Sequence, residues 1–400
     1  MGSKTTSFSQ FILWFGASVS IAEILTGALI APLGFSKGMM AIFVGHIIGA
    51  IVLYLGGTIG AQSKLSSIES TRISFGKYGS YIFSVLNIVQ LLGWTAVMII
   101  SGSKALNVVT IQLFDFSNET LWSITIGFLI ALWIILGSNN ISKVNVIAVT
   151  FLFIFTLILG FTVFTNDSQE VERISGNLHF GAAVELNVAM SLSWLPLIAD
   201  YTRNVKNEIH GTFYSVLGYF LGSTLMFTIG LGAALYVGTS DISIILVSAG
   251  LGLIALFIVL FSTVTTTFLD VFSAGVSFRN ISKMWSEKTA SLVVCAIGVI
   301  VALFVPITNY ESFLYLIGSV FAPLFAIVIT DYFVLKTRNS NRHFNVKNLC
   351  IWVIGFFAYR LLMPFHSVVG ITLPVMIGIG VISLIINGGI KICLKKSYKK

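Results

Sequence analysis

Charged residues are scarce in this sequence, since Asp, Glu, Lys and Arg make up only 10% of its 400 residues. Soluble domains carry about 25% of such residues, so a water-soluble enzyme is excluded. Proline is also rare, with six residues, which excludes collagen-like and proline-rich disordered chains. The three cysteines, Cys295, Cys350 and Cys393, are odd in number and share no ligand spacing. They therefore predict neither a disulfide framework nor a zinc site.

Apolar residues take the place of the missing charges. Hydrophobic residues make up 56% of the chain, and the mean hydropathy is +0.97. A membrane-spanning helix uses about 20 residues. The apolar runs lie at about 11–33, 39–61, 80–102, 120–137, 144–165, 187–199, 211–237, 251–274, 289–308, 313–334, 349–365 and 370–392. We therefore expect an all-α integral membrane protein with twelve transmembrane helices.

The distribution of lysine and arginine predicts how these helices are oriented. If the N-terminus is cytoplasmic, the outer segments hold only Lys37, Lys104 and Arg173. The inner segments hold Lys4, Lys64, Arg72, Lys77, Lys143, Arg203, Lys206, Arg279, Lys283, Lys288, Lys336, Arg338, Arg342, Lys347, Lys391, Lys395, Lys396, Lys399 and Lys400. Cytoplasmic loops carry this excess of positive charge. The net charge of +8 thus indicates a multi-pass membrane protein with both termini inside, rather than a protein that binds nucleic acid.

Two apolar runs are interrupted by serine pairs at corresponding positions. The first run contains Ser18 and Ser20, and the sixth contains Ser191 and Ser193. Broken helices in the two halves of a membrane protein point to a transporter binding site, because unwound backbone can contact a ligand. Serine also serves close packing of membrane helices, so the pairs alone leave both interpretations open.

Three ionisable residues, Glu23, Asp270 and Arg360, lie inside predicted spans. A charge at the bilayer centre costs about 2.5–3.5 kcal/mol even on insertion scales, so such residues usually face a partner, a cavity or a substrate. We interpret Glu23 and Asp270 as candidate functional carboxylates, with structural, paired carboxylates as the alternative. Arg360 lies near the outer half of its span and is expected to extend to the membrane surface.

Hydroxyl groups cluster on the run that contains Asp270. Ser262, Thr265 and Thr266 are spaced i, i+3 and i+4, which places them on one helix face. Oxygen ligands suit a hard cation, and the carbonyls of a broken helix could complete its shell. A polar face that only packs against another helix remains the alternative, because Thr often bonds to its own helix.

Two tryptophans, Trp94 and Trp194, lie mid-span, away from the membrane interfaces where tryptophan is usually found. Indoles that face a cavity could stack on a flat aromatic substrate, although a buried Trp more often serves packing. The sequence contains no Walker motif, no HExxH and no nucleophile elbow. A transporter is therefore favoured over an integral membrane enzyme or a passive channel.

Several strings resemble the nucleobase:cation symporter-1 family over essentially the whole chain. They are Trp14–Phe35 (WFGASVSIAEILTGALIAPLGF), Glu69–Ser80 (ESTRISFGKYGS), Gln90–Ala96 (QLLGWTA), Ala199–Arg203 (ADYTR), Pro323 and Thr330–Tyr332 (TDY). Within the family, the chain looks most similar to the bacterial hydroxymethylpyrimidine permease branch and next to cytosine permease.

The resemblance implies a leucine-transporter-type fold. It divides one transmembrane domain, 1–400, into two inverted five-helix repeats at about 11–165 and 187–334 and two additional helices at about 349–392. It also implies sodium ligands, which fall here on the carbonyls of Val19 and Ala22 and on the hydroxyls of Ser262, Thr265 and Thr266. Family substrate contacts map to Glu23, Trp94, Ser193, Trp194 and Asp270.

The function implied by the resemblance is sodium-coupled import of a pyrimidine, with hydroxymethylpyrimidine, a thiamine precursor, favoured. The alternatives are a cytosine permease or another nucleobase or hydantoin permease of the same family, with coupling to protons instead of sodium. Family members often have an amide at the position of Glu23 and near Asp270, so two carboxylates indicate an amine-rich substrate or proton involvement. We expect a functional monomer in the lipid bilayer, without enzymatic activity and without a nucleic-acid partner.

Overall fold

The computed structural model describes residues 4–136, 176–241, 253–305, 310–337, 342–365 and 367–389, together with positions 150, 153–154, 157–158, 160–161, 165 and 244. Within these residues, the regular structure is helical apart from an isolated bridge between Thr5 and Val205. The helices are α1 (Ser7–Ser18), α2 (Ile21–Leu29), η1 (Ala31–Leu33), α3 (Phe35–Ser63), α4 (Ser67–Ser70), α5 (Arg72–Phe114), α6 (Glu119–Leu136), α8 (Phe180–Ser193), α9 (Leu195–Thr202), α10 (Glu208–Val237), α12 (Leu253–Ile281), α13 (Glu287–Phe304), α14 (Tyr310–Ile329), η2 (Thr330–Val334), α15 (Val346–Leu362), α16 (Thr372–Ser383) and η3 (Leu384–Gly388).

The described helices account for most of the predicted spans. Eight are long and apolar enough to cross a membrane, and the bent pair α1 and α2 supplies a ninth. The last two predicted runs correspond to α15 and to α16 with η3. The predicted run at 144–165 and the loop charges Lys143 and Arg173 lie outside the described residues, apart from isolated positions. A total of twelve spans therefore stays a prediction.

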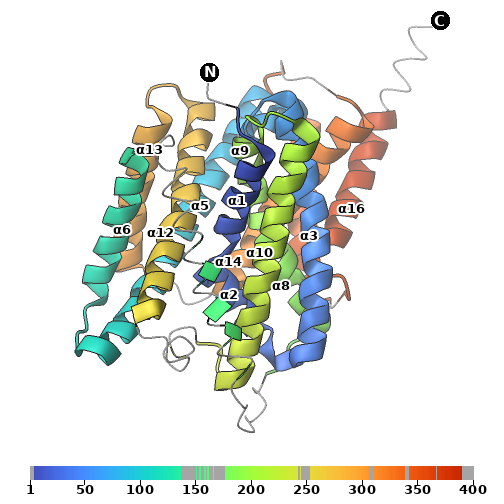
Figure 1. The fold of residues 1–400 in the computed structure, drawn as a ribbon. Helices are drawn as coiled ribbons and strands as arrows, with labels where there is room; N and C mark the ends of the chain where they lie inside the picture. Colours follow the sequence, from blue (N-terminus) through green and yellow to red (C-terminus); the bar gives the residue numbers. More distant parts are fainter. Residues whose placement is uncertain are drawn as a thin grey trace, which may run out of the picture.

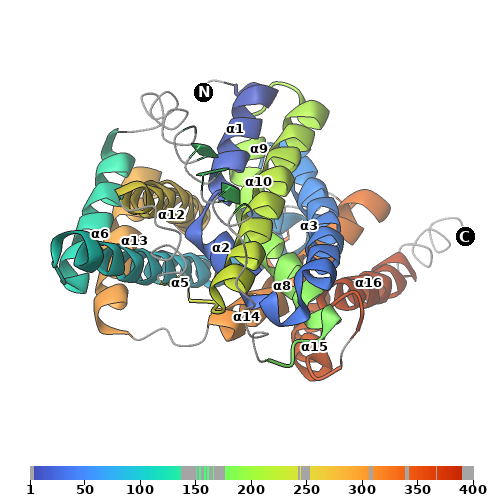
Figure 2. The same ribbon diagram turned by 60° about the horizontal axis from the view of Figure 1, so that its bottom comes forward.

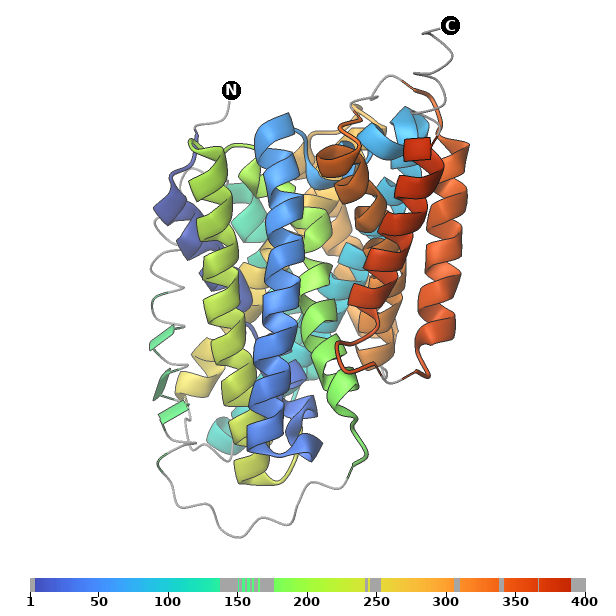
Figure 3. The same ribbon diagram turned by 90° about the vertical axis from the view of Figure 1, so that its right-hand side faces the viewer.

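The helices run roughly parallel and form one bundle with the broken helix at its centre. Figure 1 shows α6, α12 and α13 on one side and α3 and α16 on the other, with α1 and α10 side by side between them. In the view turned by 60°, α2 lies among α5, α10 and α8 (Figure 2). The chain enters α1 and leaves η3 at the same end of the bundle (Figure 3), as an even number of spans requires.

Glycines allow the backbones of the central helices α2 and α10 to pack in direct contact. A Cβ atom added to Gly230 of α10 would lie 2.1 Å from the carbonyl oxygen of Ile24 in α2. A Cβ atom added to Gly27 of α2 would lie 2.3 Å from the carbonyl oxygen of Phe227 in α10. Membrane helices pack through such small residues because lipid provides no hydrophobic drive for their association. Reciprocal glycines thus hold α2 directly against α10.

A buried carboxylate attaches the last two helices to the rest of the bundle. Glu185 of α8 is 0% exposed, and its Oε1 accepts hydrogen bonds from Tyr359 Oη (2.5 Å) and Thr372 Oγ1 (2.6 Å). Its Oε2 accepts from the backbone N–H groups of Ile371 (2.6 Å) and Thr372 (2.9 Å). Negative charge at the N-terminus of α16 is stabilising, so Glu185 is a structural carboxylate. The pair α15 and α16 forms one edge of the bundle in Figure 3.

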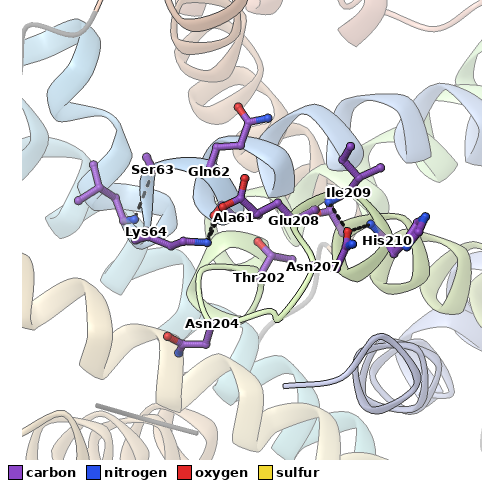
Figure 4. Close-up of polar contacts among 12 residues, drawn as sticks. Ala61, Gln62, Ser63, Lys64, Thr202, Asn204, Asn207, Glu208, Ile209 and His210 are labelled. Atoms are coloured by element: carbon purple, nitrogen blue, oxygen red, sulfur yellow. Dashed lines mark hydrogen bonds and ion pairs between the residues drawn. The ribbon is translucent and has the colours of Figure 1, made fainter. Parts of the chain in front are cut away.

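Polar contacts close the end of the bundle at which α1 begins. Figure 4 shows Lys64, the residue after α3, donating to the Glu208 carboxylate at 2.9 Å. The Asn207 side chain accepts from the N–H groups of Ile209 and His210 and so caps α10. Exposed ion pairs contribute only about 0–1 kcal/mol. These contacts therefore fix the ends of α3 and α10 locally, and the bundle itself depends on packing.

Candidate functional site

The first span is broken where the sequence predicts it. Between α1 and α2, Val19 (φ −79°, ψ 79°) and Ser20 (φ −137°, ψ 156°) leave helical geometry, and the two helices differ in direction by 54°. The Ser20 hydroxyl accepts from the N–H of Glu23 at 3.4 Å and so caps α2. The Ser262 hydroxyl of α12 accepts from the N–H of Ile21 at 3.0 Å. Two serines therefore satisfy two of the backbone N–H groups that the break exposes.

The sixth predicted run is also interrupted, directly after the serine pair, but less strongly than the first. Helix α8 continues through Ser193, and only Trp194 separates it from α9, with φ −86° and ψ −13° still in the helical region. The cause is Pro196, which has no N–H to donate and lies in the first turn of α9. The two pieces form one span, Phe180–Thr202.

The break in the first span borders a cavity lined by buried residues. The space between its lining atoms, part of which is open to the surroundings, is about 300 Å³. All five predicted substrate contacts line it, from α2, α5, α8, the α8–α9 junction and α12. The complete lining is Ser20, Ala22, Glu23, Trp94, Met98, Met190, Ser193, Trp194, Thr266 and Asp270. The structure therefore brings together residues that are up to 250 positions apart in the sequence.

Glu23 is the carboxylate in the first turn of α2 and is 1% exposed. Its Oε2 atom lies 2.6 Å from the hydroxyl of Ser223 in α10. Its Oε1 atom is buried and has no hydrogen-bond partner within the described residues. The N-terminus of a helix favours negative charge, so α2 supports a carboxylate at this position. One oxygen atom remains for an N–H group of a ligand.

The two indoles, Trp94 and Trp194, are 5% and 6% exposed. Trp194 contacts the ring of Trp14 edge-on at a centroid distance of 5.6 Å. Trp94 contacts Tyr310 at 5.9 Å and Phe313 at 5.3 Å, also edge-on. Aromatic neighbours thus pack against both indole rings, and both rings also line the cavity. The Nε1–H groups of both indoles are unpaired within the described part of the chain.

Ser193 and Asp270 contribute the remaining polar groups. The Ser193 hydroxyl donates to the Met190 carbonyl at 2.6 Å, which leaves its oxygen lone pairs to accept. Asp270 is 5% exposed and lines the cavity. The ion pairs found among the described residues involve other carboxylates. Since an unpaired carboxylate in a membrane usually faces a cavity or substrate, Asp270 is a second candidate acceptor.

Hydroxyl groups of α12 contact the backbone of the broken helix. In addition to the contact of Ser262 with Ile21, the Thr266 hydroxyl donates to the Ala17 carbonyl at 3.4 Å. The Thr265 hydroxyl donates at 2.7 Å to a carbonyl of its own helix, and its oxygen lone pairs remain available. All three side chains are buried.

Backbone carbonyls at the break complete an oxygen-only donor set. In a continuous helix the Val19 carbonyl would accept from the N–H of Glu23, but that N–H is bonded to Ser20 instead. The Ala22 carbonyl accepts from the Thr26 hydroxyl at 2.7 Å. Across the described ranges, no group of three or more His, Cys, Asp or Glu side chains is arranged to hold a metal. Oxygen donors of this kind fit a sodium ion better than a transition metal.

Four residues at or beside the cavity were not predicted as contacts. Met98 follows Trp94 by four positions and Met190 precedes Ser193 by three, so helical spacing alone could have identified both. Ser20 belongs to the serine pair already noted. The Gln90 side chain donates to the Ser193 carbonyl at 3.3 Å, and its Oε1 is unpaired within the described residues.

Solved structures share this architecture. One is Mhp1, described as a nucleobase-cation-symport-1 family transporter in a closed conformation with bromovinylhydantoin bound. It matches with a TM-score of 0.78 and 19% identity over 95% of this chain and 92% of that chain. A Na+-coupled sialic acid symporter matches with a TM-score of 0.71 and 13% identity over 98% and 90%. The leucine-transporter-type fold is confirmed.

Characterised permeases are similar in sequence. The cytosine permease of Escherichia coli (strain K12) is 27% identical over 329 residues, which cover 80% of this chain and 75% of the relative. The hydantoin permease of Microbacterium maritypicum is 22% identical over 363 residues, covering 84% and 74%. The purine-cytosine permease of Emericella nidulans is 23% identical over 415 residues, covering 95% and 78%.

A family model matches nearly the whole chain. It describes permeases for cytosine and purines, uracil, thiamine and allantoin, and it matches residues 3–386. The family predicted from the sequence strings is thereby confirmed, and its members are membrane transporters. With the broken helix, the cavity beside it and a match of this length, the chain belongs to the family of cytosine, purine, uracil, thiamine and allantoin permeases, the nucleobase:cation symporter-1 family.

Proposed function

We propose that this chain is a secondary-active symporter that imports a pyrimidine, with hydroxymethylpyrimidine favoured, together with sodium. The observation that carries the proposal is the convergence of Glu23, Asp270 and two indoles on one cavity at a broken helix. A 4-amino-pyrimidine has an N–H edge that a carboxylate can accept and a flat ring that indoles can clamp. The cavity offers acceptors and aromatic faces together.

The cation role rests on the donor set beside the cavity. Thr266 both lines the cavity and bonds to the α1 backbone, and Ala22 directly precedes Glu23 in the sequence. In related folds, unwound carbonyls of this kind coordinate the coupling ion. Sodium at this position would lie next to the Glu23 carboxylate that we propose binds the substrate, so the bound ion and the bound substrate would stabilise each other.

Uptake into proteoliposomes tests the proposal. The purified protein is reconstituted, and uptake of radiolabelled hydroxymethylpyrimidine is measured with an inward sodium gradient, with equal sodium on both sides and with potassium replacing sodium. Accumulation that requires the sodium gradient supports the symporter. Uptake that only equilibrates, whatever the gradient, would indicate a channel, and conversion of the substrate without uptake would indicate an enzyme.

A competition panel identifies the substrate class. Unlabelled hydroxymethylpyrimidine, cytosine, uracil and hydantoin are compared as competitors in the same assay. The second candidate function is a cytosine or other nucleobase permease coupled to protons, which the similarity to cytosine and purine-cytosine permeases favours. Stronger competition by cytosine than by hydroxymethylpyrimidine, with uptake driven by a pH gradient, would select this second candidate.

The membrane orientation and the oligomeric state are part of the same proposal. We propose a functional monomer in the cytoplasmic membrane of a bacterium, with both termini inside, because positive charge gathers on the loops at that end. Labelling of single cysteines introduced at Lys64 and Lys37, in intact cells, distinguishes the two orientations. The residue at position 64 should be protected and that at position 37 accessible.

A further inference from the structure

A chain of three buried side chains connects the cavity to α3. The Glu23 Oε2 atom lies 2.6 Å from Ser223 Oγ, and Ser223 Oγ lies 2.6 Å from His46 Nε2. The His46 Nδ1 atom lies 2.8 Å from the carbonyl oxygen of Ile42 in its own helix. The three side chains are 1%, 0% and 1% exposed, so water does not compete for these contacts.

The number of hydrogen atoms in this hydrogen-bond chain restricts whether Glu23 can donate or accept at the cavity. The Ile42 carbonyl can only accept, so His46 Nδ1 carries a hydrogen. Two contacts remain, from His46 Nε2 to Ser223 and from Ser223 to Glu23, and the serine hydroxyl has only one hydrogen to share between them. The second hydrogen comes either from His46 Nε2 or from Glu23 Oε2.

Both arrangements have the same consequence at the cavity. If both ring nitrogens of His46 carry hydrogen, the imidazolium donates to Ser223 and Ser223 donates to Glu23, which is then ionised as the counter-charge of the buried cation. If His46 is neutral, Ser223 donates to His46 Nε2 and Glu23 donates through Oε2 to Ser223. In both arrangements Oε1 carries no hydrogen. The Oε1 atom is the oxygen without a partner in the described residues, on a side chain that lines the cavity. It can therefore accept a hydrogen bond from a ligand but cannot donate one.

We propose that His46 and Ser223 are specificity-determining residues, which fix Glu23 as a pure hydrogen-bond acceptor toward the substrate. The site then selects a substrate edge that carries an N–H donor, such as a ring amino group, over one that carries a carbonyl oxygen. A carbonyl edge would place two acceptors against each other and leave both unsatisfied. The proposal rests on the proposed function, because it names which pyrimidines that site accepts.

The surroundings of the three residues contain few groups that could substitute for this chain. The exception is Tyr219 of α10, whose hydroxyl lies within hydrogen-bonding reach of Glu23 and Ser223 and could donate to either. Tyr310 of α14 lies close enough to interact electrostatically with Glu23, and Asp270 of α12 borders the same cavity. Tyr310 donates or accepts at Thr26 instead. The neighbours of His46 are aromatic or amide side chains, namely Phe220, Phe227 and Asn187. No lysine or arginine forms an ion pair with Glu23 in the described part of the chain.

Relative affinity for cytosine and uracil provides the first test, since the two differ in the amino and oxo groups at one ring position. Binding of radiolabelled cytosine to purified protein is measured with uracil as competitor. Ser223→Ala and His46→Leu should each reduce the preference for cytosine at least tenfold, because Glu23 can then rotate and donate a hydrogen. His46→Gln should retain most of the preference, since its amide N–H can donate to Ser223.

The matched control is Thr224→Ala, which removes the neighbouring hydroxyl of α10. Thr224 lies outside the cavity lining, and its variant should keep the wild-type preference. If Ser223→Ala and His46→Leu also keep that preference while the proteins bind cytosine normally, His46 and Ser223 serve packing only and the proposal is overturned.

A second measurement needs no substrate and so separates this proposal from the proposed function. Nitrogen NMR of histidine-labelled protein reports the tautomer and hydrogen bonding of the His46 ring. We expect a signal with Nδ1 protonated and a strongly hydrogen-bonded Nε2, which should change in both Ser223→Ala and Glu23→Gln. An Nε2 signal that is identical in the wild type and both variants would show that the chain does not form. If the signals change as expected but neither cytosine nor uracil binds, the proposed substrate class fails while the hydrogen-bond chain stands.

Discussion

Replacing Trp194 with alanine removes one wall of the cavity, and the environment of the ring indicates how much substrate affinity is lost. The ring is 6% exposed, and its uncovered part borders the cavity. Base stacking on an aromatic side chain is worth about 1–3 kcal/mol by alanine substitution, which corresponds to roughly five- to 150-fold in affinity. We therefore expect Trp194→Ala to weaken pyrimidine binding by about tenfold or more. Trp194→Phe, which keeps a ring, should show a smaller loss.

Packing must be separated from stacking, because Trp194 also contacts Trp14 and Tyr219 edge-on at 5.6 and 6.3 Å. Such contacts contribute about 0.5–1.5 kcal/mol each, and truncation of a buried Trp costs about 3–5 kcal/mol. Thermal unfolding in detergent measures that stability loss, and equilibrium binding of radiolabelled substrate to the folded fraction measures stacking. Trp133→Ala in α6, away from the cavity lining, controls for loss of an indole. A folded Trp194→Ala protein whose affinity changes less than about threefold would refute the stacking argument, because even the weakest stacking contribution exceeds that change.

Three further predictions concern the polar residues. Thr266→Ala should abolish sodium stimulation of substrate binding while leaving the protein folded, and persistence of that stimulation in both Thr266→Ala and Thr265→Ala would remove the cation assignment. Glu23→Gln should keep the fold but weaken selection of cytosine over uracil, because an amide can both donate and accept; an unchanged competition panel and unchanged sodium dependence would make Glu23 structural. Glu185→Ala should lower the apparent melting temperature, since the four donors around Glu185 lose their acceptor at about 1–3 kcal/mol for each buried group left unsatisfied. Binding affinity measured on the folded Glu185→Ala protein should equal that of the wild type, and a specific loss of affinity would place Glu185 in the transport mechanism.

The spans were predictable because each one is encoded locally. Hydropathy over about 20 residues identifies a membrane helix without reference to its neighbours, so the run at 39–61 corresponds to α3 and that at 211–237 to α10. The break in the first span was also local, since Ser18 and Ser20 mark it. In the sixth span the same serine pattern is followed by a weaker interruption, a single residue, Trp194, whose φ and ψ stay in the helical region. Serine is compatible with a helix that packs tightly, and the pattern therefore does not specify how strongly a helix is broken.

The polar clusters could not be predicted in the same way, because their members lie far apart in the sequence. His46 and Ser223 are separated by 177 positions, and Glu185 and Thr372 by 187. A single histidine in an apolar run indicates that a partner exists but not which one. For the cavity, family motifs supplied this missing information at Glu23, Trp94 and Trp194. Met98 and Gln90 lie outside the mapped contacts, although each is four positions from Trp94 and helical spacing could have indicated both.

The broken helix places the proposed cation site next to the proposed substrate site. Unwinding at Val19 and Ser20 removes helical hydrogen bonds, and the replacements come from Ser20 itself and from Ser262 of α12. The Ser262 hydroxyl that stabilises the break thus lies on the same face of α12 as the predicted cation ligands Thr265 and Thr266. Because α2 begins directly after the break, the position of Glu23 depends on how α12 holds Ile21. Any change that moves α12 relative to α1 therefore alters the carbonyls at the break and the Glu23 carboxylate together. If these groups bind the proposed cation and substrate, this shared dependence couples the two ligands through one helix break.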